Sequence, residues 1–464
     1  MQPYQLTGLQ AAAQIKSKQL SPVELVDSVL ERISAVDELV HAFAVVTAEA
    51  AREAARKAEQ EISSGIYRGP LHGLTVGVKD LVETAGVATT SSSQSRLDYV
   101  PERDAAIVRR LRDAGAIMVG KTHTHEFAFG VITPTTRNPW NTDHIPGGSS
   151  GGSGAALAAG MCHIAIGTDT GGSIRIPAAV NGVFGLKPTY GRVSRTGIAS
   201  LSWALDHVGP MARTVADAAA MLQAVAGYDR ADPATVDVPL EDYSAALDRG
   251  VDGLTIGVPT NYFFDNIDPE VESAIRGAVE ALAGLGATVR EVEIPLPAAY
   301  MPAEYAIFCS EASAYHQQRL RERGERIGDD VRVLLEAGEL ILATDYIKAL
   351  RARTLLQEGW RDLYAHNGLD LVAAPTLPHV AAQVGQKLFE IGDPEPVINA
   401  YVRTSAPGNL TGLPAASVPC GFSKSGLPIG LQLIGKPFAE STVLQAAAAY
   451  ERVNERAGEL ARIG

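Results

Sequence analysis

The stretch that decides the fold class is AAIVRRLRDAGAIMVGKT, residues 105–122. Its first half places Ile107, Val108 and Leu111 at helical spacing, with charged residues between them. Gly115 then interrupts the pattern, as glycine commonly does after the last turn of a helix. The apolar run that follows is typical of a buried strand. The stretch therefore predicts a helix, a glycine stop and a strand in direct succession.

Further strands are predicted on both sides of this unit. LTVGVKDLV (74–82) and HIAIGTD (163–169) are short apolar runs, and LTIGVPT (254–260) opens a second strand, helix and strand succession. That succession continues with a helix from about residue 268 to 285 and a strand in ATVREVEIP, 287–295. Alternation of this kind indicates an α/β protein built on a sheet.

The two ends of the chain are expected to pack onto the same sheet. Residues 1–65 are predicted to be helical, and Ser21 with Glu24 forms a capping box that places Pro22 at the first helical position. The segment 300–365 is also predicted to be helical. The last strands are expected in LDLVAAPT, AASVPCG and GLQLIG, and they most easily join the sheet begun near residue 71. We therefore predict one domain, residues 1–464, with a functional core at about 70–215.

Composition excludes several classes of function. The 464 residues carry a formal charge of −13, with 46% hydrophobic and 20% charged residues, as in a soluble globular protein. The acidic balance argues against nucleic acid and anionic membrane surfaces as partners. No signal peptide and no stretch of about 18 apolar residues is recognised. The three cysteines are scattered, which favours reduced buried thiols and a cytoplasmic location.

The loop IPGGSSGGSG, residues 145–154, has the composition of a flexible linker. A linker is disfavoured because the helix-forming run AALAAGM follows at once. A phosphate-binding loop is disfavoured because no lysine follows the glycines. Ser149 and Ser150 each satisfy the G-x-S-x-G pattern of a nucleophile elbow, but only His379 lies where its histidine would be expected.

Metal and cofactor chemistry find little support. His123 and His125 form an H-x-H pair, but no further residues recur with the spacing of metal ligands. We therefore expect neither a metal nor a cofactor.

A second serine framed by glycines, Ser173, stands in GTDTGGSIRIP after a predicted strand. The backbone N–H groups of Thr170, Gly171 and Gly172 can converge there and form an oxyanion hole. Lys79, at the end of its apolar strand, is a candidate base because burial lowers the pKa of a lysine. The alternative is a lysine paired with Asp80. Two serine loops and one buried lysine together supply what acyl transfer needs without histidine.

Three segments carry a resemblance to a known family: GLTVGVKDLVETAGVATTSSS, PGGSSGGSGAALAAG and GTDTGGSIRIPAAVNGVFGLKPTYGRVSRTG. Their order and spacing resemble the amidase signature family. The likeness continues in WALDHVGPMARTVADAA and in the tail from Gly408, and it covers residues 5 to 455. It implies an α/β fold with a large mixed central β-sheet flanked on both faces by helices.

The resemblance also implies roles for individual residues. Ser173 is the expected nucleophile, Ser149 a relay serine that follows a cis peptide bond, and Lys79 the base. The expected oxyanion donors lie in the loop from Thr170 to Ser173. Supporting hydrogen bonds are expected from Ser150, Asp169 and Arg175.

The expected reaction is hydrolysis of a carboxylic amide C–N bond through an acyl-enzyme, releasing ammonia or an amine. Two alternatives within the family stay open: a carbamate (urethane) or ester hydrolase, and the glutaminase component of a tRNA-dependent amidotransferase. That component typically has an acidic residue where this chain has Val402, which favours a stand-alone amidase acting on a small-molecule amide or carbamate. Phe127 and Phe129 resemble residues that line the acyl side of the pocket in relatives, and core packing explains them equally well. The sequence leaves a homodimer open.

Overall fold

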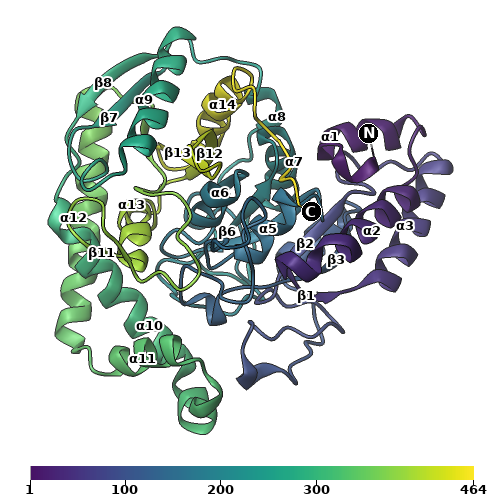
Figure 1. The fold of residues 1–464 in the computed structure, drawn as a ribbon, viewed down its shortest axis with the longest axis horizontal. Helices are drawn as coiled ribbons and strands as arrows, with labels where there is room; N and C mark the ends of the chain where they lie inside the picture. The colour runs from purple at the N-terminus through teal and green to yellow at the C-terminus, as the bar shows by residue number, and fades with distance from the viewer. Residues whose placement is uncertain (1, 464) are drawn as a thin grey trace.

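The computed structural model describes residues 2–463 and centres on one eleven-stranded sheet (Figure 1). The strand order is β1-β3-β2-β4-β6-β5-β12-β13-β9-β7-β8. Parallel pairs join β2 to β3 and β4, and join β7 to β8 and β9, whereas the remaining pairs are antiparallel. The sheet is therefore mixed, as predicted.

The strands come from nearly the whole length of the chain. Their bounds are β1 Phe43–Val46, β2 Thr75–Lys79, β3 Ile117–Thr122, β4 Ile164–Asp169, β5 Phe184–Lys187, β6 His207–Ala212, β7 Thr255–Pro259, β8 Thr288–Val292, β9 Leu371–Pro375, β12 Ala415–Phe422 and β13 Pro428–Gly435. A separate two-stranded ribbon pairs β10 (Leu388–Phe389) with β11 (Glu395–Pro396).

Helices surround this sheet, with α1 to α3 at one end and α10 to α12 at the other (Figure 1). Their bounds are α1 Gly8–Lys16, α2 Pro22–Val40, α3 Ala48–Ser63, α4 Ala106–Asp113, α5 Gly151–Ala158, α6 Arg175–Asn181, α7 Val215–Val225, α8 Tyr243–Ala246, α9 Pro269–Gly284, α10 Tyr300–Arg323, α11 Asp329–Glu339, α12 Ala343–Asn367, α13 Val397–Thr411 and α14 Glu440–Glu451. Single 3-10 turns occur at Pro3–Gln5, Gln94–Arg96, Glu126–Ala128, Pro297–Ala299 and Gly324–Arg326.

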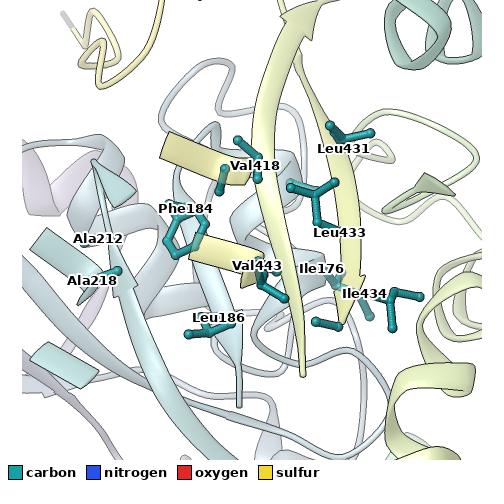
Figure 2. Packing of buried hydrophobic residues seen from close by; sticks show 14 of the residues in the cluster. Ile176, Phe184, Leu186, Ala212, Ala218, Val418, Leu431, Leu433, Ile434 and Val443 are labelled. Atoms are coloured by element: carbon teal, nitrogen blue, oxygen red, sulfur yellow. The ribbon is translucent and has the colours of Figure 1, made fainter. Parts of the chain in front are cut away.

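Both faces of the sheet are buried. On β4, Ile164 and Ile166 belong to one apolar cluster, together with residues of α7, whereas Ala165 belongs to a second cluster together with residues of α5. Alternate side chains of a strand point to opposite faces, so helices cover both. Figure 2 shows the larger cluster where Phe184 on β5 and Val418 on β12 pack. This arrangement confirms the predicted fold class.

Local structure agrees with the sequence signals at most positions. The hydroxyl of Ser21 accepts a hydrogen bond from the Val23 N–H at 2.9 Å, and the Glu24 carboxylate accepts from the Ser21 N–H at 2.9 Å. The capping box therefore forms as predicted. No helix within residues 2–463 is long and apolar enough to cross a membrane.

Candidate active site

Lys79 ends β2 and is fully buried. Its Nζ lies 2.7 Å from Ser149 Oγ, 2.8 Å from Ser150 Oγ and 2.7 Å from Thr168 Oγ1. Strands β2 and β4 run parallel, so their carboxyl ends, which carry Lys79 and Thr168, meet at one edge of the sheet. The structure thus brings the predicted base to both candidate serines and adds Thr168, which the sequence did not single out.

The electrostatic surroundings of Lys79 favour its neutral form. Burial lowers the pKa of Lys79 well below its usual value, and the charges of Asp169 and Asp206 oppose this only in part. Asp80 lies 3.7 Å from the Nζ of a different lysine, Lys121. The alternative in which Lys79 is paired with Asp80 is therefore wrong.

The Gly/Ser loop enters α5 through a cis peptide bond between Gly148 and Ser149. Gly147 has φ +70, and a Cβ built on it would lie 2.9 Å from the Val180 side chain, so only glycine fits this turn. The Ser149 carbonyl accepts a hydrogen bond from the His125 N–H at 3.0 Å. Helix α5 begins at Gly151 and not at Ser153, where the sequence placed its start.

Ser173 stands on the neighbouring loop, between β4 and α6. The Ser150 N–H donates to the Ser173 carbonyl at 3.2 Å, which joins the two serine loops. Lys79 and Ser149 are 0% exposed, whereas Ser173 is 5% exposed. Of the three predicted catalytic residues, Ser173 is the one that solvent reaches.

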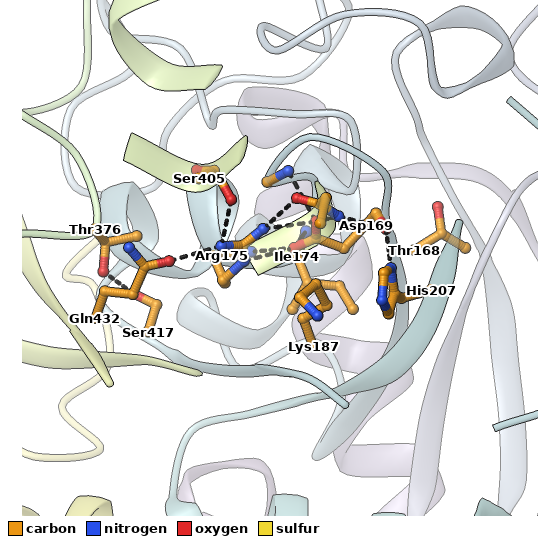
Figure 3. A network of polar contacts seen from close by, with 12 residues as sticks. Thr168, Asp169, Ile174, Arg175, Lys187, His207, Thr376, Ser405, Ser417 and Gln432 are labelled. Atoms are coloured by element: carbon orange, nitrogen blue, oxygen red, sulfur yellow. Dashed lines mark hydrogen bonds and ion pairs between the residues drawn. The ribbon is translucent and has the colours of Figure 1, made fainter. Parts of the chain in front are cut away.

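A buried polar network anchors the Ser173 loop (Figure 3). The Asp169 carboxylate accepts from the N–H groups of Gly172 at 2.8 Å and Ile174 at 3.2 Å. Arg175 donates to Asp169 at 3.0 Å, and its remaining donors reach Asn409, Gln432 and the Ser405 carbonyl. Burial alone would raise the pKa of Asp169, but the Arg175 charge overrides it and holds this pKa below its usual range.

The candidate oxyanion donors differ in whether they are free. Within residues 2–463, the amides of Thr170 and Gly171 donate to no protein acceptor. The Gly172 amide, in contrast, already donates to Asp169. The Thr170 hydroxyl donates to Asp206 at 2.7 Å, which fixes this side of the loop. The sequence grouped the three amides together because it could not show that a carboxylate occupies one of them.

A small pocket opens beside the two loops. It is lined by Thr168, Thr170, Asp206, Ala128 and the segment 198–203, together with Arg195, His207 and Val208. Phe127 and Phe129, on either side of Ala128, are buried and pack against His316 and Phe308. Their role in a substrate pocket stays a prediction, since Ala128 is the residue of this turn that lines the opening.

A buried carboxyl group, Glu304 on α10, also lies at the candidate site. A Cβ built on Gly171 would lie 3.1 Å from Glu304 Oε1 and 3.5 Å from Val402. The sequence signal was an acidic residue on the apolar face of a helix, between Tyr300 and Ile307, and we did not single it out. Val402 lies beside the candidate oxyanion loop, and so does an acidic residue from another helix.

The remaining histidines make ordinary contacts. The His123 ring pairs with Ser92 at 3.2 Å, and the His125 ring lies 3.1 Å from Asp330. His379 stacks on Phe389, and burial lowers its pKa to about 4. Across residues 2–463, no group of three or more His, Cys, Asp or Glu side chains is placed to hold a metal ion.

A mixed sheet covered on both faces, with a buried lysine held against two serine loops, defines the class of protein. The family model described as Amidase matches residues 24–444. The chain therefore belongs to the amidase family, and it is an enzyme of the amide-hydrolysing kind.

Individual relatives agree with this assignment. A Pseudomonas putida protein named Amidase is 47% identical over 450 residues, which covers 96% of each chain. The glutamyl-tRNA(Gln) amidotransferase of Moorella thermoacetica contributes a second relative, its A component, which is 42% identical with 98% of each chain covered. Among solved structures, a chain described as part of a vestigial complex that reveals the origins of an s-triazine catabolic enzyme superimposes with a TM-score of 0.93. It is 33% identical, and the match covers 99% of this chain and 100% of that one.

Proposed function

We propose that this chain hydrolyses a carboxylic amide through an acyl-enzyme formed on Ser173, with Lys79 as base and Ser149 as relay. The observation that carries the proposal is a lysine, buried away from every carboxylate contact, whose Nζ lies against the hydroxyl groups of Ser149, Ser150 and Thr168. A neutral amine that donates two hydrogen bonds has one lone pair left to accept a third. It can therefore take a proton from a hydroxyl group.

The proposed reaction proceeds in balanced steps. Lys79 takes the proton of Ser149, Ser149 takes that of Ser173, and Ser173 Oγ bonds to the substrate carbonyl carbon. The amides of Thr170 and Gly171 stabilise the negative oxygen that develops. The protons then return through Ser149 to the leaving nitrogen, the C–N bond breaks, and water hydrolyses the acyl-enzyme by the same route.

The gradient of burial supports this division of roles. A substrate can reach Ser173, which is 5% exposed, but not the fully buried Lys79 or Ser149. Ser150 stabilises the loops, since it bonds to Lys79 and its amide holds the Ser173 carbonyl. Asp169 and Arg175 fix the Ser173 loop from below.

We further propose a stand-alone amidase and not one component of an amidotransferase. The first relative described is an amidase whose chain is matched over 96% of its length, which supports this choice. A turnover panel of aryl amides, alkyl amides, carbamates, esters and glutamine, run with the purified chain alone, separates these activities. Glutamine turnover above all the others would contradict the proposal.

The test of the mechanism is covalent labelling with a sulfonyl fluoride, read by mass spectrometry. We expect the label on Ser173, and we expect Ser173→Ala to remove both labelling and amide hydrolysis. Ser149→Ala should slow both. Ser153→Ala is the matched control from the same loop, because Ser153 Oγ bonds to the Ile166 carbonyl and Thr122 and not to Lys79. A label on Ser150, or full hydrolysis by Lys79→Ala, would show the mechanism to be wrong.

A further inference from the structure

Glu304 is a carboxyl group without any partner. It lies on the buried face of α10, is 0% exposed, and neither of its carboxyl oxygens has a hydrogen-bond partner within residues 2–463. An unsatisfied buried polar group destabilises a fold unless it serves another purpose. The group therefore calls for a ligand that the protein alone does not supply.

Its position relates it to the reacting centre. The Glu304 carboxyl abuts Gly171, whose amide is one of the two free donors of the candidate oxyanion loop, and a Cβ at 171 would lie only 3.1 Å from Oε1. Gly171 is itself partly exposed. Glycine thus leaves room between the solvent-facing side of the loop and the carboxyl group beneath it.

The neighbouring cations do not pair with Glu304. Arg175 is committed to Asp169, Asn409, Gln432 and a carbonyl, and Lys187 donates to the carbonyls of Pro188 and Leu413. Burial raises the pKa of Glu304 well above its usual value, and the charge of Asp169 adds to this shift. The side chain therefore carries a proton and offers one O–H donor and one C=O acceptor.

We propose that Glu304 is a specificity-determining residue that binds a second, neutral carboxamide group of the substrate. The inference rests on the proposed function, because it needs the scissile carbonyl at the Thr170 and Gly171 amides. A carboxylic acid and a carboxamide match each other through two hydrogen bonds, O–H to C=O and N–H to C=O. In a primary amide the leaving group is ammonia, so the second carboxamide belongs to the acyl part.

The experiment compares diamides with alkyl amides. Malonamide, succinamide and glutaramide are tested against butyramide, pentanamide and hexanamide, because the series varies the spacing between the two groups. We expect kcat/KM for the fitting diamide to exceed that for its alkyl partner by at least about tenfold, since a site built for a polar group rejects the analogue that lacks it. Glu304→Leu should remove this ratio and leave alkyl amide hydrolysis within about threefold.

Two further variants make the test decisive. Glu304→Gln retains a donor and an acceptor and should keep most of the preference, whereas Glu322→Gln, at an exposed position of the same helix, should change nothing. The proposal is overturned if the wild type shows no preference for any diamide, or if Glu304→Leu lowers both substrate series equally. It is also overturned if Glu304→Gln loses as much as Glu304→Leu, because a charged carboxylate would then be the binding group.

Sulfonyl fluoride labelling separates the two levels of the proposal. If Ser173 is labelled in every Glu304 variant and the diamide preference is absent, the assignment of Glu304 is wrong and the proposed mechanism stands. If Ser173 is unlabelled in the wild type, the proposed function itself is wrong. Thermal unfolding of Glu304→Leu verifies that the variant folds, which we expect because leucine replaces an unpartnered side chain of similar volume.

Discussion

Lys79 is a lysine whose surroundings offer hydroxyl groups and no carboxylate contact. Most buried lysines are paired, as Lys121 on the neighbouring β3 is with Asp80. The contrast between two buried lysines on adjacent strands shows that burial alone does not make a base. The partners decide it, because a carboxylate stabilises the charged form and a hydroxyl group can exchange a proton.

The first prediction concerns the pH dependence of hydrolysis. Since neutral Lys79 is the proposed base, kcat/KM should rise as pH increases through the pKa of Lys79 and should fall on the acid side. Asp206 raises this pKa through its charge, so Asp206→Asn should lower it further and move the acid limb to lower pH. The measurement is kcat/KM across pH, normalised to each variant's maximum.

The control is Asp248→Asn, which removes a charge from a side chain that is 97% exposed. Solvent and salt screen such a charge, so its acid limb should coincide with that of the wild type. A shift of the Asp206→Asn limb to higher pH would contradict the assignment of Lys79 as base.

The sequence allowed the central residues to be predicted but not their whole environment. Lys79, Ser149 and Ser173 stand in long motifs, so the family resemblance indicated them directly. Thr168 and Glu304 contact the site only after β2 has paired with β4 and α10 has packed beside the Ser173 loop. Such contacts depend on tertiary structure, and local sequence carries no record of them.

At the scale of elements, the turn between β4 and α6 depends on one ion pair. Arg175 and Asp169 are both 0% exposed, and Arg175 also bonds to Asn409 on α13 and Gln432 on β13. The pair thus ties the Ser173 loop to two elements from the C-terminal part of the chain.

The second prediction follows from this pair. Arg175→Met should lower the free energy of unfolding by about 3–5 kcal/mol, because it leaves the Asp169 charge buried without its partner. The double variant Arg175→Met/Asp169→Asn should lose less than the sum of the two single variants. Urea unfolding of all four proteins measures the coupling. Strictly additive losses would show that the pair contributes no mutual stabilisation.

The third prediction concerns the start of α2. Ser21→Ala removes the hydroxyl group that caps the Val23 amide, and should lower the free energy of unfolding by about 0.5–2 kcal/mol. Ser21→Gly should cost only a few tenths of a kcal/mol relative to serine, since water then reaches the amide. Thermal or urea unfolding measures both. An effect of Ser21→Gly larger than that of Ser21→Ala would argue against capping.

Elements were predicted well where a local signal sufficed. The strands at Thr75–Lys79, Ile117–Thr122 and Ile164–Asp169 lie within the apolar runs that indicated them, and α9 ends within a residue of its expected position. The order of strands in the sheet was not predictable in this way. Strand β5 pairs with β12, more than 200 residues later, and nothing in either run specifies that partner.

At the scale of the whole molecule, three thiols report on cooperativity. Cys162, Cys309 and Cys420 are buried, and burial raises the pKa of Cys162 and Cys309 to about 12. A protonated, shielded thiol does not react with disulfide reagents. Native protein should therefore release no signal with Ellman's reagent, and the denatured chain should release three equivalents.

The fourth prediction uses the spacing of these cysteines to test the single domain. If residues 1–464 form one domain, the three thiols should become reactive over the same range of urea concentration. Mass spectrometry of the partly modified protein identifies which cysteine has reacted. Cys162 and Cys420 reacting at clearly different urea concentrations would divide the chain into separate folding units.

The pairing of β5 with β12 also has a consequence for how the chain is made. During translation, Asn409 and Gln432 leave the ribosome 234 and 257 residues after Arg175. Until then, β5 presents an unpaired edge and the Arg175–Asp169 pair lacks its outer contacts. We expect the nascent chain to depend on chaperones over this interval, and its catalytic competence to arise only in the last tenth of synthesis.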